Sequence, residues 1–281
     1  FYSKLNITLL IASVCLWKKY HPKHITNLYV DNTTYDKLIL LDILYLWDNV
    51  EILKYADRIN RVILWAGCKP KVISQTKTPM LIVDHDFLIF KNIDEHLKDE
   101  VIYSYDEDMS QWYINSDDEY NKQLTNPIEF VQDKAANVSF LYLPDVNFAI
   151  EYGQQTVGRL TEFTALLGDN LNTGYLSACE QYELKEMLIK SKIKHKTLNQ
   201  NIYSCNNLKF KEEKNNIGIW DLKESFLSYK HYGVDKRNIF DNKKGYKYVE
   251  SISYLYRCIK ASKLMSIEYL EDKFNKHIKN R

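Results

Sequence analysis

The sequence predicts an α/β protein in which helices flank a mostly parallel sheet, because strand patterns and helix patterns alternate along the chain. Three short apolar runs are typical of buried strands, and they span residues 25–30, 50–53 and 80–83. Apolar residues recur at helical spacing over residues 5–20, 35–41 and 60–75. Strands that alternate with helices are joined by right-handed crossovers, which bring the strands together in parallel.

The rest of the chain predicts more strands and a helical C-terminal end. Strand patterns occur at residues 101–105 and 138–143. Amphipathic helices are predicted at residues 149–167, 181–193, 248–260 and 264–278. The polar, acidic residues 106–136 predict a long excursion over a site, or a surface loop. We expect one domain over residues 1–245, with residues 246–281 packed on it as a helical extension.

Composition narrows the class of protein. At 281 residues and 45% hydrophobic content, the chain can bury a sizeable core, and its net charge of +1 argues against nucleic acid as a partner. The five cysteines are scattered and never have CxxC spacing, which predicts reduced thiols in the cytoplasm rather than disulfides or structural zinc. The apolar residues 7–17 are too few to span a bilayer. Because the chain begins at Phe1, we expect it to be a piece of a larger protein.

The most informative segment is Asp84-His85-Asp86, which follows the apolar strand 80–83 directly and precedes a second apolar run. Two carboxylates at this spacing repel each other strongly unless a cation lies beside them. Oxygen ligands at the edge of an α/β sheet suit Mg²⁺ or Mn²⁺, with water and phosphate completing the coordination. The segment therefore predicts a metal–diphosphate site. The chain has neither GxGxxG nor GxxxxGK[ST], so a bound nucleotide would be held by metal and side chains.

Two other uses of this segment stay open. It could be a solvated turn or a helix cap, although a surface turn does not need apolar residues on both sides. It could also belong to a phosphatase of the haloacid dehalogenase type, which has a nucleophilic Asp and a second Asp two residues later. Those enzymes normally have Thr or Val two positions after the second Asp, where this chain has Leu88. A phosphatase is therefore the weaker interpretation.

Motifs that follow one another along the chain add a family resemblance. They are Leu28-Tyr29-Val30-Asp31, Trp65 with Lys69, Pro79 through Asp84 and Asp86 to Lys91, Asn137-Val138-Ser139, Glu180-Gln181, His195-Lys196-Thr197-Leu198, and His231-Tyr232-Gly233 followed by Lys236. In this order they resemble a group of GT-A fold glycosyltransferases from bacterial surface-polysaccharide loci and large DNA viruses. The resemblance implies a GT-A-like, Rossmann-related fold and a sugar-transfer reaction.

The resemblance also implies a metal centre. Asp84 and Asp86 would hold Mn²⁺, or Mg²⁺, against the diphosphate of a nucleotide-sugar donor. His231 would be a further metal ligand, since a neutral imidazole suits Mn²⁺ better than Mg²⁺. Lys236 would offset charge on the departing diphosphate. In glycogenin-like retaining transferases the corresponding Gly and Lys follow the His one residue later than Gly233 and Lys236 do here.

Further candidates concern the nucleotide and the acceptor. Asp31 is expected to contact the base or ribose, or else to cap the next helix, and Lys69 is a second expected donor contact. An inverting enzyme needs a carboxylate base, whereas the leaving phosphate can take that role in a retaining enzyme. Glu180, at the predicted start of a helix, is a candidate for the base or for a capping carboxylate. Asp106 and its neighbour Glu107 compete for the same role.

The sequence thus predicts a metal-dependent glycosyltransferase that moves a sugar from a nucleotide diphosphate to a glycan or another hydroxyl acceptor. The alternatives are a non-catalytic module that binds nucleotide sugars or glycans and, with less support, a metal-dependent phosphatase. The basic C-terminal helix, with Lys273 and Lys276, suits a weak contact with an anionic membrane surface or a solvated face.

Overall fold

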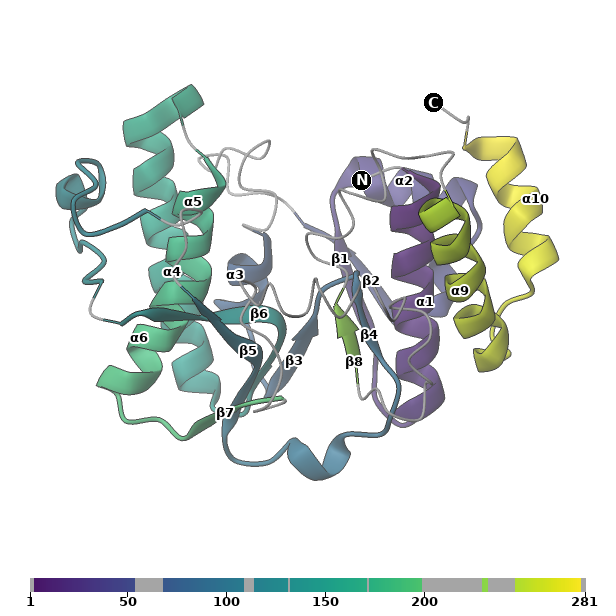
Figure 1. Ribbon diagram of the computed structural model, residues 1–281, viewed down its shortest axis with the longest axis horizontal. Helices are drawn as coiled ribbons and strands as arrows, with labels where there is room; N and C mark the ends of the chain where they lie inside the picture. The colour runs from purple at the N-terminus through teal and green to yellow at the C-terminus, as the bar shows by residue number, and fades with distance from the viewer. Residues whose placement is uncertain are drawn as a thin grey trace. The chain divides into compact units, whose positions relative to one another are not determined.

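The computed structural model describes residues 3–53, 68–108, 114–130, 132–170, 172–198, 229–231 and 246–278. The chain divides into two compact units, whose elements are labelled in Figure 1. Unit 1 comprises Phe1–Lys54, Asp84–Glu95 and Glu212–Arg281. Unit 2 comprises Tyr55–Val83 and His96–Lys211.

Unit 1 contains two pairs of strands. The parallel pair is β1 (Asn27–Val30) with β2 (Asn49–Ile52), and the antiparallel pair is β4 (Phe87–Ile89) with β8 (Tyr229–His231). The helices of this unit are α1 (Lys4–Tyr20), α2 (Asn32–Leu40), η1 (Leu44–Leu46), α9 (Tyr246–Ser262) and α10 (Ile267–His277). Helix α2 lies in the crossover from β1 to β2, as the alternating pattern predicts for parallel strands.

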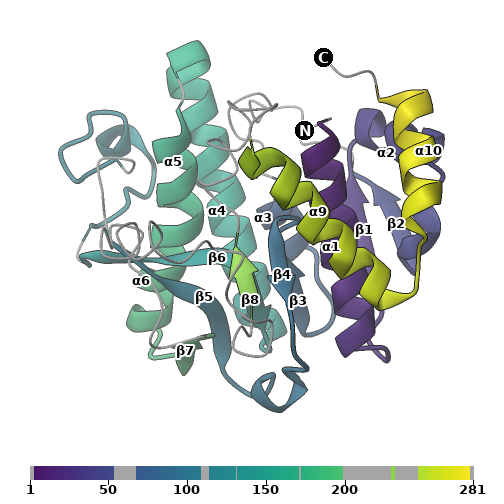
Figure 2. The same cartoon turned by 45° about the vertical axis from the view of Figure 1, so that its right-hand side comes forward.

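The long helix α1 forms the centre of the core of unit 1. It lies beside α9 in both views and also contacts β4 (Figures 1 and 2). Leu88 and Phe90 join its buried face in one hydrophobic cluster that also includes residues of α9 and α10. Ser3 caps its N-terminus by accepting from the Asn6 N–H, and the helix ends at Tyr20, directly before His21-Pro22, as predicted.

Unit 2 is built on one four-stranded sheet. The strand order is β3 (Met80–Val83), β6 (Lys134–Leu143), β5 (Val101–Asp108) and β7 (His195–Thr197). Its main helical segments are α3 (Cys68–Ile73), α4 (Val146–Leu167), α5 (Thr173–Ser177), the π-helix η5 (Ala178–Tyr182) and α6 (Glu183–Lys190). Short 3-10 helices are η2 (Asp94–His96), where the chain passes from unit 1 to unit 2, η3 (Asn121–Gln123) and η4 (Gly168–Asn170).

Helices α3 and α4 approach each other closely at Gly153. A Cβ atom at this position would lie 2.4 Å from the Ser74 N atom and 2.8 Å from the Pro70 O atom, so only glycine fits without a shift of α3. Tyr152 and Phe148 extend this contact into a buried cluster with the inner face of the sheet.

The prediction of an α/β protein with C-terminal helices is confirmed, but the mostly parallel sheet is not. Among the described residues of unit 2, β5 pairs with β7 in parallel, whereas β3 and β5 both pair with β6 antiparallel. A parallel neighbour needs a crossover, usually a helix. The described residues 114–130 between β5 and β6 contain only the short η3, and the chain returns antiparallel.

The predicted excursion 106–136 is also shorter than expected, because β5 continues to Asp108 and β6 begins at Lys134. The polar ends of these strands pair with each other, and polarity alone does not distinguish such ends from a loop. Within the described residues, no helix combines the length and apolar character that crossing a membrane requires.

Candidate functional site

The Asp-x-Asp segment forms a tight turn between two strands. Strand β3 ends at Val83, and the Phe87 N–H donates to the Asp84 carbonyl oxygen at 3.0 Å, after which β4 begins. Asp86 is only 5% exposed, whereas Asp84 is partly buried. A buried carboxylate is costly unless it is paired, hydrogen-bonded or bound to a metal. The predicted succession of strand, carboxylates and apolar strand is confirmed. The predicted burial of the strands at residues 25–30, 50–53 and 80–83 is wrong, because among the described residues β3 is an edge strand and β1 and β2 form a two-stranded sheet; of their residues only Val30 is buried.

The register of β4 and β8 brings a distant part of the chain to this turn. Phe87 is the pairing partner of His231, so the backbone of His231 lies opposite the residue that directly follows Asp86. Two predicted metal ligands and the backbone of the third therefore lie at one end of the same strand pair. Lys236, the predicted diphosphate contact, lies outside the described residues.

Strand β4 is held firmly within unit 1. Phe87, Leu88 and Ile89 are all at most 2% exposed, and the Ser13 hydroxyl of α1 donates to the Phe87 carbonyl oxygen at 3.0 Å. Sequence reasoning missed Ser13, because nothing in a helical pattern shows that a small polar residue meets a strand far along the chain.

A second contact anchors the segment that follows β4. The Ile93 N–H donates to Nε2 of His21 at 3.0 Å, and the imidazole stacks on Trp17 with 4.0 Å between ring centroids. Burial lowers the pKa of His21 below its usual value, which keeps the ring neutral and able to accept this bond. Sequence reasoning missed this role of His21 too.

Asp31 lies at the carboxyl end of β1, and its side chain caps α2. Its Oδ1 atom accepts from the Thr34 N–H at 2.6 Å. The helix-cap alternative is therefore confirmed, and a contact between Asp31 and a nucleotide stays a prediction.

In unit 2, the structure brings Lys69 and Glu180 together. The Lys69 Nζ atom lies 3.1 Å from Glu180 Oε1 and donates to the Val138 carbonyl oxygen at 3.1 Å. The Glu180 side chain is only 4% exposed. The sequence predicted Lys69 as a donor contact and Glu180 as a base or a capping carboxylate, without a link between the two residues.

Glu180 does not open a helix, contrary to the sequence-based expectation. The helical segment begins at Thr173, where the Asn172 side chain accepts from the Gly174 N–H at 2.8 Å. It continues through η5 to Lys190 and places Glu180 inside the π turn. Asn172 and Gly174 thus take part in the start of this helical segment.

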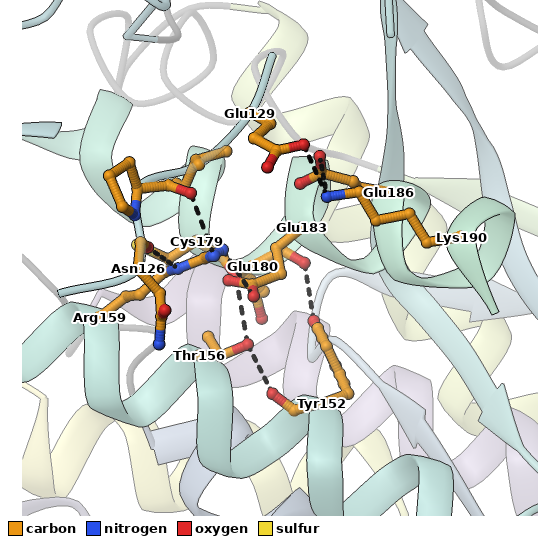
Figure 3. Close-up of polar contacts among 12 residues, drawn as sticks. Asn126, Glu129, Tyr152, Thr156, Arg159, Cys179, Glu180, Glu183, Glu186 and Lys190 are labelled. Carbon is orange, nitrogen blue, oxygen red and sulfur yellow. Dashed lines mark hydrogen bonds and ion pairs between the residues drawn. The ribbon is translucent and has the colours of Figure 1, made fainter. Parts of the chain in front are cut away.

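Two more carboxylates of the same helical segment are also buried (Figure 3). Glu183 pairs with Arg159 at 2.6 Å, and Glu186 pairs with Lys190 at 3.1 Å. Burial raises the pKa of Glu183 to about 7, although the Arg159 guanidinium acts in the opposite direction. Arg159 also donates to the Asn126 carbonyl oxygen at 2.9 Å, which ties the segment before β6 to α4.

Asp106 is engaged in another ion pair. It lies 2.8 Å from Lys185 Nζ and accepts from the Tyr103 hydroxyl at 2.7 Å. Burial acts to raise the pKa of Asp106, but the hydrogen bonds from Lys185 and Tyr103 outweigh it and lower the pKa. A lower pKa makes Asp106 a weaker base. The neighbouring Glu107 accepts from the Asn137 amide at 3.2 Å.

The candidate residues fall into the two units. Unit 1 holds Asp31, Asp84, Asp86 and the backbone of His231, while unit 2 holds the others that are described. Within the described residues, no three or more His, Cys, Asp or Glu side chains form a group that could hold a metal ion. Metal binding at the Asp-x-Asp turn stays a prediction.

No protein-family model matches the chain, and no curated protein is significantly similar to it.

Proposed function

We propose that this protein is a metal-dependent glycosyltransferase that moves a sugar from a nucleotide-diphosphate donor to a glycan or another hydroxyl acceptor. One observation carries most of the proposal. The Asp84–Asp86 turn begins a strand whose antiparallel partner sets the backbone of His231 opposite Phe87. The Asp84–Asp86 turn and His231 are far apart in sequence and are expected to share one ligand. The pairing of β4 with β8 brings their backbones close together.

The residue types at this turn, and His231 opposite it, are those that a divalent metal such as Mn²⁺ would accept as ligands. Asp84 and Asp86 offer carboxylate oxygens, and His231 would add an imidazole, which Mn²⁺ accepts more readily than Mg²⁺ does. Diphosphate oxygens and water would complete the coordination. A metal bound there would supply a Lewis acid that neutralises charge on the leaving diphosphate.

The surroundings of the turn favour a fixed site over a mobile surface loop. Asp86 is buried, β4 is fully buried behind it, and Ser13 holds the carbonyl of the next residue. Carboxylates held in place by their supporting residues bind a metal with less loss of conformational freedom. A solvated turn, the simplest alternative, does not require this support.

The candidates for acceptor activation are Glu180 and Asp106. Each is held by a lysine, Glu180 by Lys69 and Asp106 by Lys185. Glu180 is the candidate that we propose, because the pKa of Asp106 is lowered. In an inverting reaction its pair with Lys69 has to open or rearrange when the acceptor binds. A retaining reaction has no such requirement, because the leaving phosphate takes the proton.

Hydrolysis of sugar nucleotides tests the proposal. Purified protein is incubated with a panel of uridine, guanosine and cytidine diphosphate sugars, with Mn²⁺ or with a chelator. A transferase releases free sugar and nucleoside diphosphate slowly, only with metal, and loses this activity in Asp86→Asn. Donor binding without any release would indicate a binding module, and release of inorganic phosphate a phosphatase. Either result would contradict the proposal.

A further inference from the structure

The helical segment that carries Glu180 contains a one-residue widening. The Glu183 N–H bonds to the carbonyl oxygen of Ala178, five residues back, rather than to that of Cys179, four residues back. An α-helical register would use the Cys179 carbonyl. Such π turns are rare in helices and are frequent at functional sites.

Helix α4 supplies hydroxyl groups to the carbonyls of this turn (Figure 3). The Thr156 hydroxyl lies 3.2 Å from the Cys179 carbonyl oxygen, which the shifted Glu183 N–H does not use, and 2.9 Å from the Tyr152 carbonyl oxygen of its own helix. The Tyr152 hydroxyl donates to the Glu180 carbonyl oxygen at 2.7 Å. Both side chains are fully buried, so water does not substitute for them.

Helix α4 also packs against α3, which carries Lys69, the ion-pair partner of Glu180. Tyr152 and Thr156 are four residues apart and share a face of α4. Gly153 lets the backbone of α3 approach α4 closely, and Lys69 of α3 forms the ion pair with Glu180. Three helical elements therefore meet at Glu180: α3 contacts its carboxylate, and α4 contacts its backbone carbonyl.

We infer that Tyr152 and Thr156 are positioning residues that hold the π turn and thereby direct Glu180 toward Lys69. Neither touches the reacting atoms; both act through the backbone carbonyls of residues 179 and 180. Closing the turn to an α-helix would rotate the residues before it relative to α6 by about 100°, the turn of one residue. Glu180 would then leave Lys69. The structural part of this inference is independent of the proposed function, and its effect on turnover rests on that function.

Variants that remove a hydroxyl and keep the shape test the inference. Thr156→Val and Tyr152→Phe are made singly and together, with Thr156→Ser as the conservative variant. Thr161→Val is the matched control, because among the described residues the Thr161 hydroxyl bonds within α4, to the Val157 carbonyl oxygen at 2.8 Å. Crystal structures of the variants show which carbonyl the Glu183 N–H uses.

The expected result is that the double variant moves the Glu183 N–H to the Cys179 carbonyl and separates Glu180 from Lys69 beyond ion-pair distance. Thr156→Ser and the control should keep the π turn. If the double variant keeps the π turn and the ion pair, the inference is wrong. Should the double variant not fold, the two single variants decide, by the same comparison of the hydrogen bond and the ion pair.

Kinetics test the consequence for turnover. Loss of the π turn should lower kcat by about 10- to 100-fold and leave KM for the donor unchanged, with recovery in Thr156→Ser. A rearranged turn with unchanged kcat would remove Glu180 from the reaction and leave the structural inference standing. If the wild-type protein transfers no sugar, the proposed function fails, and the crystal structures still decide whether Tyr152 and Thr156 hold the turn.

Discussion

Two glycines of α4 should respond in opposite directions to the same substitution. A Cβ atom at Gly153 would lie 2.4 Å from the Ser74 N atom and 2.8 Å from the Pro70 O atom. Both are backbone atoms of the α3 region, which cannot rotate away. At Gly158 no described atom outside the surrounding backbone of α4 lies within 4 Å of the added methyl group. Gly153→Ala should therefore destabilise unit 2, and Gly158→Ala should stabilise it.

The magnitude follows from two effects. Replacing glycine by alanine inside a helix contributes about 0.5–1 kcal/mol of stability. Forcing an extra methyl group into a close-packed contact costs about 1–3 kcal/mol, and a backbone contact belongs at the upper end of that range. Gly153→Ala should therefore lose about 2 kcal/mol net. Gly158→Ala should gain the full helix contribution, so the two variants should differ by about 3 kcal/mol.

Equilibrium urea unfolding compares the two variants with the wild type, and hydrogen exchange of peptides from α4 assigns the change to unit 2. We expect faster exchange in α4 for Gly153→Ala and slower exchange for Gly158→Ala. A Gly153→Ala protein as stable as the wild type would refute the close approach of α3 and α4. It would also remove the structural basis for the pair of Lys69 with Glu180.

Two pH profiles follow from buried groups. The pKa of Glu183 is raised from 4.5 to about 7, so its stabilising contribution is full below pH 4.5 and is lost as pH rises to 7. As pH rises over that range, the free energy of unfolding of Glu183→Gln should increase by up to about 3 kcal/mol relative to that of the wild type. Glu151→Gln, at an exposed position of α4, should show no such increase. Unfolding free energies of Glu183→Gln and the wild type that change with pH in parallel would contradict this prediction. The pKa of His21 is lowered from 6.5, so the contribution of His21 to the stability of the fold is full above pH 6.5. This contribution is lost as pH falls, because protonation removes the acceptor for the Ile93 N–H. Urea unfolding between pH 7 and pH 5 should show this loss in the wild type and not in His21→Gln, and an equal loss in both would show that His21 is not its source.

Local patterns predicted the positions of most described helices and of the strand that leads into Asp84. The helix at residues 5–20 ends where His21-Pro22 predicts, and apolar residues on both sides of the carboxylates are indeed strands β3 and β4. These features depend on hydrophobic periodicity and on backbone restrictions near proline, and both are local properties of the chain.

Pairing and buried charges could not be predicted in the same way. The antiparallel partners of β6 are set by contacts between distant segments, which periodicity does not reveal. Glu183 and Arg159 look like residues of solvated helix faces, yet they are buried against each other. The π turn at Glu180 depends on hydroxyls of a different helix, and no signal within residues 178–182 marks it.

The most direct test of the central claim is metal-dependent binding of a nucleoside diphosphate to the Asp84–Asp86 turn. Isothermal calorimetry with uridine and guanosine diphosphates, with Mn²⁺ and with a chelator, compares the wild type with Asp86→Asn. Asp36→Asn, at an exposed position of α2 in the same unit, is the matched control. We expect at least one diphosphate to bind only with Mn²⁺, Asp86→Asn to weaken this binding by about 10- to 100-fold, and Asp36→Asn to leave it unchanged. Unchanged Mn²⁺-dependent affinity in Asp86→Asn would show that the turn is not the metal site.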